Sequence, residues 1–286
     1  MPNTRLLLET FHGGAAQGLS DRERSNERIR VFAGPADWYL DWRPPPRRPG
    51  PAEDGVKGFE LTDFVRRLVG GEPDVLEALW ANAGDVLAVD SLLTPLLERR
   101  GYLLSTRAVQ RYLSQATARW QTVCERRSWL QDCPLLPTDR QEFNAESSPP
   151  ARFPARLVHE QRYEHRRRQF LRCEAWQEGR SPAQCQLEAR IGYDSDVAMQ
   201  ALRHARMAAE IARSAVVTVR RPDCAELLAI RDGAWSFDAV QCALRESIQD
   251  ASINAGAGPL PEIADEPLAS QLVTQALTRH LAELAR

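Results

Sequence analysis

The stretch His12–Phe32, HGGAAQGLSDRERSNERIRVF, decides how the rest of the chain is interpreted. The apolar run Leu6–Leu8 precedes its two adjacent glycines, and Ile29–Phe32 has the composition of a second strand. This order predicts a strand, a Gly-Gly turn, a helical segment and a returning strand. Glycine lets the backbone approach an anion closely, and a helix N-terminus presents unpaired N–H groups, so Gly13 and Gly14 are candidate phosphate-binding residues. The other interpretation of this glycine pair is an ordinary turn.

The same stretch resembles the signature of polymerase-beta-type nucleotidyltransferases, in the subgroup of RNA-repair-associated and phage nucleotidyltransferases. Gly13-Gly14 stands where that signature has Gly-Ser, and Ala16–Leu19 stands where it has Ala-Tyr-Gly-Leu. Ser25–Arg30 matches the scaffold of its Ser-Asp-x-Asp-x-Arg segment. The resemblance implies a nucleotide- or phosphate-binding role for these aligned positions: Gly13, Gly14, Asn26, Arg28 and Arg30.

The resemblance extends over most of the chain. Glu60–Phe64 and Glu72–Leu79 match the Glu-Leu-x-x-Phe and Asn-Pro-x-x-x-Glu-x-Leu patterns of two family helices, except that the Asn is absent. In a later helix the family usually carries a Lys and a His one turn apart, to which the resemblance gives a phosphate or substrate role. This chain has Asp196 and Gln200 there but keeps the arginine that follows. The resemblance therefore makes Arg203 a further phosphate-binding candidate.

The catalytic residues of the family signature are replaced. Family members hold two metal ions with two carboxylates on one face of a strand and a third on a neighbouring strand. The aligned positions here are Asn26 and Arg28, and the third would fall near Gly55, beside Asp54. An arginine cannot ligate a metal, so we expect no catalytic residue, no metal and no cofactor. A guanidinium binds phosphate bidentately, which is one role for Arg28; a surface ion pair with a nearby carboxylate is the other.

Three functions follow from this replacement. The first is a catalytically degenerate nucleotidyltransferase-like protein, a pseudoenzyme, which binds a nucleotide or nucleic acid (RNA or DNA) as a subunit of a larger assembly with a protein partner. The second is an active transferase that modifies RNA or protein and holds Mg²⁺ with a non-standard set drawn from Glu27, Asp54 and Glu60. The third is a protein-interaction scaffold with a vestigial pocket. Family analogy adds RNA repair or phage defence as the setting.

A second candidate site is a run of arginines in a helix expected over about Ala155–Glu178. The segment reads RYEHRRRQFLR, and basic side chains interleaved with aromatic ones suit a nucleic-acid backbone. A solvated helix face, diluted by Glu160, Glu164 and Glu174, is the alternative. The candidate nucleic-acid-binding residues are Arg162, Arg166, Arg167 and Arg168.

The fold class expected from these patterns is α+β. We predict a small mixed sheet with flanking helices, a nucleotidyltransferase-like domain over residues 1–104, and a mainly helical domain over residues 105–286. Apolar residues at helical spacing predict helices over Leu61–Leu68 and about Thr106–Leu130. A stripe of small residues, including Ala201, Ala205, Ala208 and Ala212, predicts a further helix over about Ser195–Ala215 that packs closely against other helices. The proline- and glycine-rich segment Arg43–Gly58 is expected to be a loop between strands.

Composition sets wider limits on the function. The 286 residues carry a formal net charge of −2, so no global field attracts nucleic acid or an anionic membrane, although arginine is clustered locally. No apolar stretch reaches the roughly 18–20 residues of a membrane span. The six cysteines form no Cys-x-x-Cys or Cys/His cluster, and no secretory signal is recognisable. We therefore expect a cytoplasmic protein with reduced thiols, no structural zinc and no membrane partner.

Overall fold

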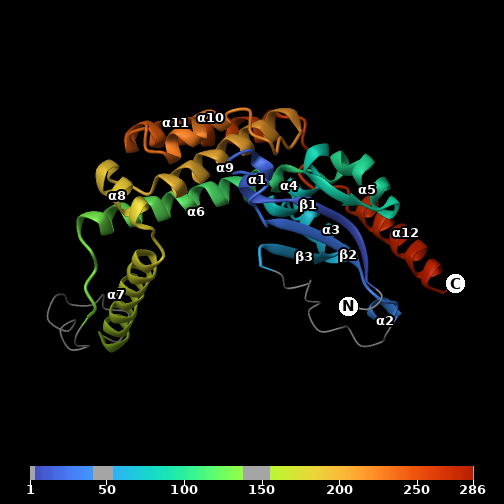
Figure 1. Cartoon of the computed structure of the whole chain (residues 1–286), viewed down its shortest axis with the longest axis horizontal. Helices are drawn as coiled ribbons and strands as arrows, with labels where there is room; N and C mark the ends of the chain where they lie inside the picture. The colour runs from blue at the N-terminus through green and yellow to red at the C-terminus, as the bar shows by residue number, and fades with distance from the viewer. Residues whose placement is uncertain (1–3, 41–53, 138–154, 286) are drawn as a thin grey trace.

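The computed structural model describes residues 4–40, 54–137 and 155–285, with the backbone alone for residues 155–159. Figure 1 shows an elongated, curved molecule with a small sheet at one end and long helices that run from it toward the other end. This arrangement confirms the α+β prediction of a small mixed sheet with flanking helices followed by a mainly helical C-terminal half.

The sheet has four strands in the order β3-β2-β1-β4. β1 (Arg5–Phe11) pairs antiparallel with β2 (Arg28–Ala33) and with β4 (Val86–Val89), while β3 (Val56–Glu60) pairs parallel to β2. Side chains alternate between the two faces of a strand, and the inward-facing ones form the core of this half. The antiparallel register of β1 and β2 places their charged residues together on the opposite face.

Helices cover the apolar face of the sheet. α3 (Leu61–Val69) begins at Glu60, whose side chain accepts a hydrogen bond from the Asp63 backbone N–H, and such a cap satisfies one of the free donors of a first helical turn. α3 buries the predicted apolar stripe, and α4 (Pro73–Leu79) starts with a proline that suits the first turn. The shorter elements of this half are α1 (Gly13–Gln17), α2 (Asp37–Leu40), η1 (Ala83–Asp85), η2 (Ser91–Leu93), α5 (Thr94–Arg99) and η3 (Arg100–Leu103).

The C-terminal half is built of longer helices, and α9 lies at its centre between α6 and α11. Ala201, Ala205, Ala208 and Ala212 of α9 are fully buried, so the small-residue stripe packs closely against its neighbours, as the sequence predicts. The helices are α6 (Thr106–Gln131), α7 (Ala155–Glu178), α8 (Pro182–Ile191), α9 (Ser195–Ser214), α10 (Cys224–Arg231), α11 (Phe237–Ala257) and α12 (Glu266–Leu284).

The main hydrophobic core extends across residue 104, the end of the predicted first domain. It joins Leu7 and Ile29 of the sheet with Ile211 of α9 and with Leu272 and Ala276 of α12. α12 packs against α3 and α5, so the C-terminal helix covers part of the N-terminal half. The two halves therefore share this core, while a second cluster, which includes Leu202, Leu227 and Leu244, lies among the long helices.

The prediction of a loop over Arg43–Gly58 is wrong at its end, where Val56–Gly58 belongs to β3; residues 43–53 lie outside the described residues. Glycine keeps its backbone N–H and C=O, so Gly58 pairs in register with Arg30 of β2. The sequence also gave no prediction of β4 or α8. Within the described ranges, we find no helix whose length and apolar content together suit a bilayer span.

Candidate functional site

Gly13 and Gly14 open α1 directly after β1, as the sequence predicts for a phosphate-binding corner. Gly13 has a left-handed φ of 62°, and a Cβ there would clash with the Glu27 carboxylate. A Cβ on Gly14 would lie 2.7 Å from the Ser20 hydroxyl oxygen. Both positions thus leave no room for a side chain beside Glu27 and Ser20. Because the exposed Glu27 side chain already lies against Gly13, a phosphate at this corner would have to displace it.

Asn26 and Arg28 do not share a strand face, because β2 begins only at Arg28. The Asn26 side-chain amide donates to the Asp54 carbonyl (3.2 Å), and the Arg28 backbone N–H donates to the Gly55 carbonyl (2.9 Å). These bonds connect the start of β2 to the start of β3. Asn26 therefore lies at the surface, where its side chain connects the loop before β2 to the loop before β3.

Arg28 and Arg30 flank one carboxylate on the polar face of the sheet. The register pairs Arg30 with Glu9 and Arg28 with Phe11. The Glu9 Oε1 atom lies 2.9 Å from Arg30 Nε and 3.4 Å from Arg28 Nη1, and the Arg28 guanidinium stands over the Phe11 ring. Arg28 keeps 37% of its side chain exposed. Arg28 and Arg30 thus share the Glu9 carboxylate on this face, beside the Gly13 corner.

A second charged group at the same corner was not singled out by sequence. Asp74, at the start of α4, lies 2.5 Å from Lys57 Nζ and 3.5 Å from His12 Nε2. The hydrogen bond from His12, together with Lys57, holds the pKa of Asp74 well below its usual range. The position of His12 between β1 and the two glycines is a sequence signal for a role at this corner. Lys57 carries no such signal, because it lies in the segment predicted to be a loop.

The carboxylates of the active-enzyme hypothesis do not converge. Glu60 is buried, caps α3 and accepts hydrogen bonds from the Tyr39 and Thr62 hydroxyls (2.9 and 3.1 Å). Asp54 precedes β3 and Glu60 ends it, roughly 20 Å apart at about 3.3 Å per residue. Throughout the described residues, no three His, Cys, Asp or Glu side chains gather in a way that could hold a metal ion.

Arg203, the remaining phosphate candidate, lies inside the protein and does not line an open cleft. Its side chain is 5% exposed, and Nη1 is 3.0 Å from the Glu77 carboxylate. Glu77 also accepts hydrogen bonds from Gln17 Nε2 (2.7 Å) and the Tyr112 hydroxyl (3.3 Å). Burial alone would raise the pKa of Glu77, but the Arg203 guanidinium lowers it. Together, the ion pair and these two hydrogen bonds connect α1, α4, α6 and α9. In this structure Arg203 therefore stabilises the core.

His204 completes this buried network as a neutral ring. Its Nδ1 atom is 2.6 Å from the Gln200 carbonyl, which only accepts, and its Nε2 atom is 3.0 Å from Arg203 Nη2, which only donates. These partners assign the proton to Nδ1. Burial, with the adjacent Arg203 charge, lowers the pKa of His204 to about 3.

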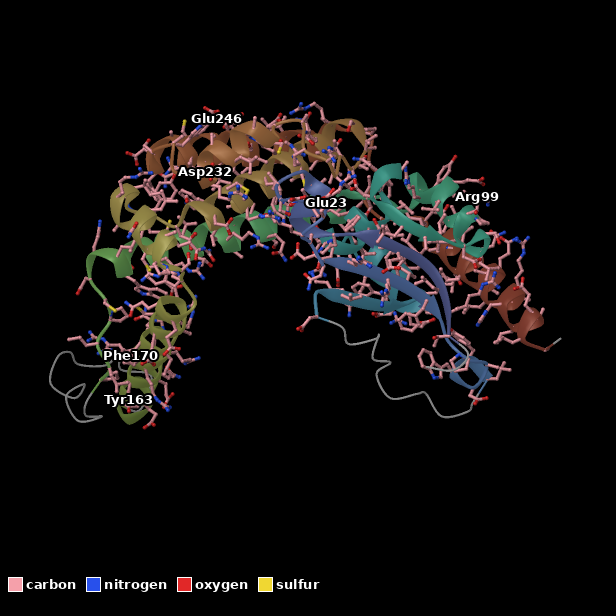
Figure 2. All side chains as sticks on the ribbon, viewed as in Figure 1. Glu23, Arg99, Tyr163, Phe170, Asp232 and Glu246 are labelled. Carbon is pink, nitrogen blue, oxygen red and sulfur yellow. The ribbon has the colours of Figure 1, made fainter. Side chains whose placement is uncertain are left out.

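The arginine run lies on α7, at the end of the molecule opposite the sheet (Figure 1). Arg162, Arg166, Arg167 and Arg168 are all exposed, and Figure 2 shows the side chains of Tyr163 and Phe170 on the same helix. Arg168 Nε donates to the Glu164 carbonyl (3.1 Å), and Arg167 lies 4.0 Å from the Glu164 carboxylate. The structure thus places these four arginines on one accessible helix.

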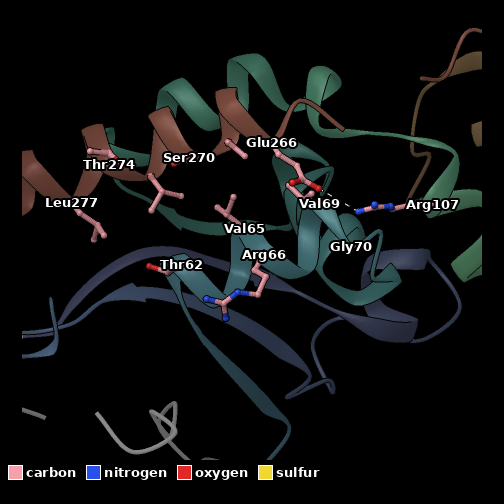
Figure 3. Close-up of a pocket in the computed structure, with 12 residues that line it drawn as sticks. Thr62, Val65, Arg66, Val69, Gly70, Arg107, Glu266, Ser270, Thr274 and Leu277 are labelled. Atoms are coloured by element: carbon pink, nitrogen blue, oxygen red, sulfur yellow. Dashed lines mark hydrogen bonds and ion pairs between the residues drawn. The ribbon is translucent and has the colours of Figure 1, made fainter. Parts of the chain in front are cut away.

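A groove of about 580 Å³ lies between α3 and α12, away from both candidate sites (Figure 3). Val65, Val69 and Leu277 contribute to its apolar wall, and an ion pair between Arg107 and Glu266 (3.4 Å) closes one end. None of the candidate binding residues predicted from the sequence lines this groove.

Comparisons of the chain with protein-family models, with curated proteins and with solved structures find no match.

Proposed function

We propose that this protein is a catalytically degenerate, nucleotidyltransferase-like protein that binds the backbone of a nucleic acid, RNA or DNA, as a subunit of a larger assembly. The observation that carries the proposal is the set of exposed arginines on α7. Sequence-independent binding to nucleic acid depends on lysine and arginine side chains that reach phosphates. A helix that projects from the body of the protein presents such side chains without steric obstruction from the core.

The charge balance of α7 supports this role. Its 24 residues, roughly 36 Å at the rise of an α-helix, contain six arginines and four glutamates. Three of the arginines are consecutive, at 166–168, so they spread over more than half of the helix circumference. A phosphate chain that crosses the helix can meet them from several directions. Tyr163 and Phe170 add aromatic surfaces on which bases can stack.

The corner beside Gly13 supports the degenerate character of the proposed activity. Two-metal catalysis requires carboxylates gathered around ions about 4 Å apart. Here Arg28 stands where the family signature has a carboxylate. Of the carboxylates in the active-enzyme hypothesis, Glu60 caps α3, Glu27 lies against Gly13 and Asp54 precedes β3. Arg28, which keeps 37% of its side chain exposed, provides a second phosphate contact.

The first test measures binding of labelled single-stranded RNA and DNA by fluorescence anisotropy over a range of salt concentrations. The triple variant R166A/R167A/R168A is compared with R99A/R245A/R279A, which removes the same charge from exposed sites on other helices. Arg99 lies at the opposite end of the molecule from α7 (Figure 2). If three phosphate contacts are lost, the slope of log K against log salt should fall by about 2, since each contact contributes about 0.7.

The outcome that contradicts nucleic-acid binding is either no binding by the wild-type protein at low salt or an equal loss in both triple variants. A stable protein partner recovered without nucleic acid would then favour the scaffold hypothesis.

A second test addresses the corner. We expect R28A to weaken binding of RNA ends or nucleotides, whereas R213A, which breaks a surface ion pair on α9, should not. Labelled nucleotide is also incubated with the protein, Mg²⁺, and RNA or protein acceptors. Transfer above background would overturn the degenerate assignment and support an active enzyme.

A further inference from the structure

The end of α6 and the C-terminal part of α7 meet in a small cluster of their own. Trp129, Cys173 and Trp176 are buried together there, and the two indole rings are 5.7 Å apart. Cys133, which follows α6, brings its Sγ atom to 3.1 Å from the Sγ of Cys173. A disulfide bond is about 2.05 Å long, so the two sulfurs need to approach by only about 1 Å to form one.

The two thiols of this pair differ in environment. Cys133 is exposed, and its sulfur accepts a hydrogen bond from Gln177 Nε2 (3.4 Å). Cys173 is 1% exposed, and burial together with the neighbouring Cys133 raises its pKa well above that of an ordinary thiol. An oxidant from solvent therefore reaches Cys133 first, while Cys173 remains a protonated thiol in contact with it.

We propose that Cys133 and Cys173 form a redox pair, which a peroxide converts into a disulfide that fastens α7 to the end of α6. The Cys133 thiolate attacks one peroxide oxygen, the O–O bond breaks, and the departing oxygen takes a proton to leave as water. The resulting sulfenic acid is attacked by the Cys173 sulfur: the S–S bond forms, the S–O bond breaks, and the hydroxide leaves with the Cys173 proton as a second water. The two sulfurs give up two electrons, which reduce the peroxide. A dithiol reverses the reaction by exchange.

The consequence is a covalent constraint between two segments 40 residues apart in sequence. In the reduced protein, α7 is held at this junction by the Trp129–Trp176 contact and by ion pairs such as Arg172–Glu125 (2.5 Å). The disulfide would fix the orientation of α7 at this point. This inference rests on the sulfur geometry alone and does not depend on the function proposed above.

The test uses the purified, fully reduced chain, titrated with hydrogen peroxide and analysed by peptide mapping without reductant. We expect a peptide pair linked through Cys133 and Cys173, released by dithiothreitol. The exposed Cys124 and Cys242 are internal controls and should remain thiols at the same dose. Tryptic cleavage within the 166–168 arginine run should also slow several-fold in the oxidised protein.

Two serine variants separate the roles of the thiols. In C173S, a dimedone-type probe should trap sulfenic acid on Cys133, because the resolving thiol is gone. In C133S, Cys173 should resist peroxide. The proposal is overturned if Cys133 oxidises no faster than Cys124 and Cys242, or if the linked peptide forms equally fast in urea, since neither result needs the folded geometry. These outcomes are independent of nucleic-acid binding.

Discussion

Acidification from about pH 7 to pH 5 should destabilise this protein by about 2 kcal/mol through His204 alone. In the unfolded chain a histidine binds a proton near its ordinary pKa of 6.5, whereas the folded environment lowers that pKa to about 3. Between these values the unfolded state binds a proton that the folded state excludes. The stabilising effect of a neutral His204 is therefore complete above pH 6.5 and is lost progressively as the pH falls toward 3.

The magnitude follows from linkage. Each pH unit below the unfolded pKa costs about 1.36 kcal/mol, so the 1.5 units between 6.5 and 5 give about 2 kcal/mol. The structural reason is that the second proton would have to sit on Nε2, facing the Arg203 guanidinium at 3.0 Å. Neither group has access to water that could screen them.

The measurement is urea unfolding at several pH values and constant ionic strength for wild type and His204→Gln. A glutamine can accept the Arg203 hydrogen bond but does not titrate, so its pH slope should be shallower by up to one proton. His165→Gln, on the exposed surface of α7, is the matched control and should leave the slope unchanged. If wild type and His204→Gln show the same pH dependence between pH 7 and 5, our account of the buried network is wrong.

Three further predictions concern stability, each measured by urea unfolding. Glu77→Gln leaves the arginine of the buried pair without its counter-charge and should cost about 3–5 kcal/mol. Gly13→Ala forces a side chain into a left-handed φ of 62° and should cost about 1–2 kcal/mol. Ala205→Leu inserts three heavy atoms into a fully buried site on α9 and should cost about 1–3 kcal/mol by overpacking.

Each of these three substitutions has a control in the same chain. Glu98→Gln removes an exposed carboxylate from α5 and should be close to neutral, as should Ala282→Leu on the exposed side of α12. Gly192→Ala also requires a left-handed φ, but a Cβ there meets nothing within 4 Å. A Gly13→Ala cost no larger than that of Gly192→Ala would show that the Glu27 contact adds no strain. If Glu77→Gln costs no more stability than Glu98→Gln, the buried ion pair does not have the role described above. If Ala205→Leu costs no more than Ala282→Leu, the buried site on α9 is not tightly packed.

The features that sequence predicts well here are those specified by neighbouring residues. α3 follows from Leu61, Phe64, Val65 and Leu68, which recur at helical spacing and are all buried. The small-residue stripe of α9 is equally local. β4 was not predicted because it has only four residues and owes its existence to pairing with β1, about 80 positions earlier in the chain. The sequence does not predict β3, because the segment directly before it is rich in proline and glycine and favours a loop.

The sequence predicts where the candidate phosphate-binding corner lies better than it predicts which partners its charged side chains have. The order of β1, Gly13-Gly14, α1 and β2 appears in the local sequence. Whether an arginine meets solvent or a carboxylate depends on distant residues. Arg203 and Glu77 are 126 positions apart, and no local pattern indicates that they pair. By contrast, Arg166, Arg167 and Arg168 are exposed on α7, which agrees with a local interpretation of the arginine run.

The position of α12 has a consequence for the order of events during synthesis. The sheet and α3 are made first, yet Leu272 and Ala276, which complete their core, are added only after helices α6 to α11. A growing chain that has passed residue 104 still exposes the α3 surface that α12 will cover. Part of the apolar surface of the N-terminal half therefore stays uncovered until α12 has been translated and can pack against it.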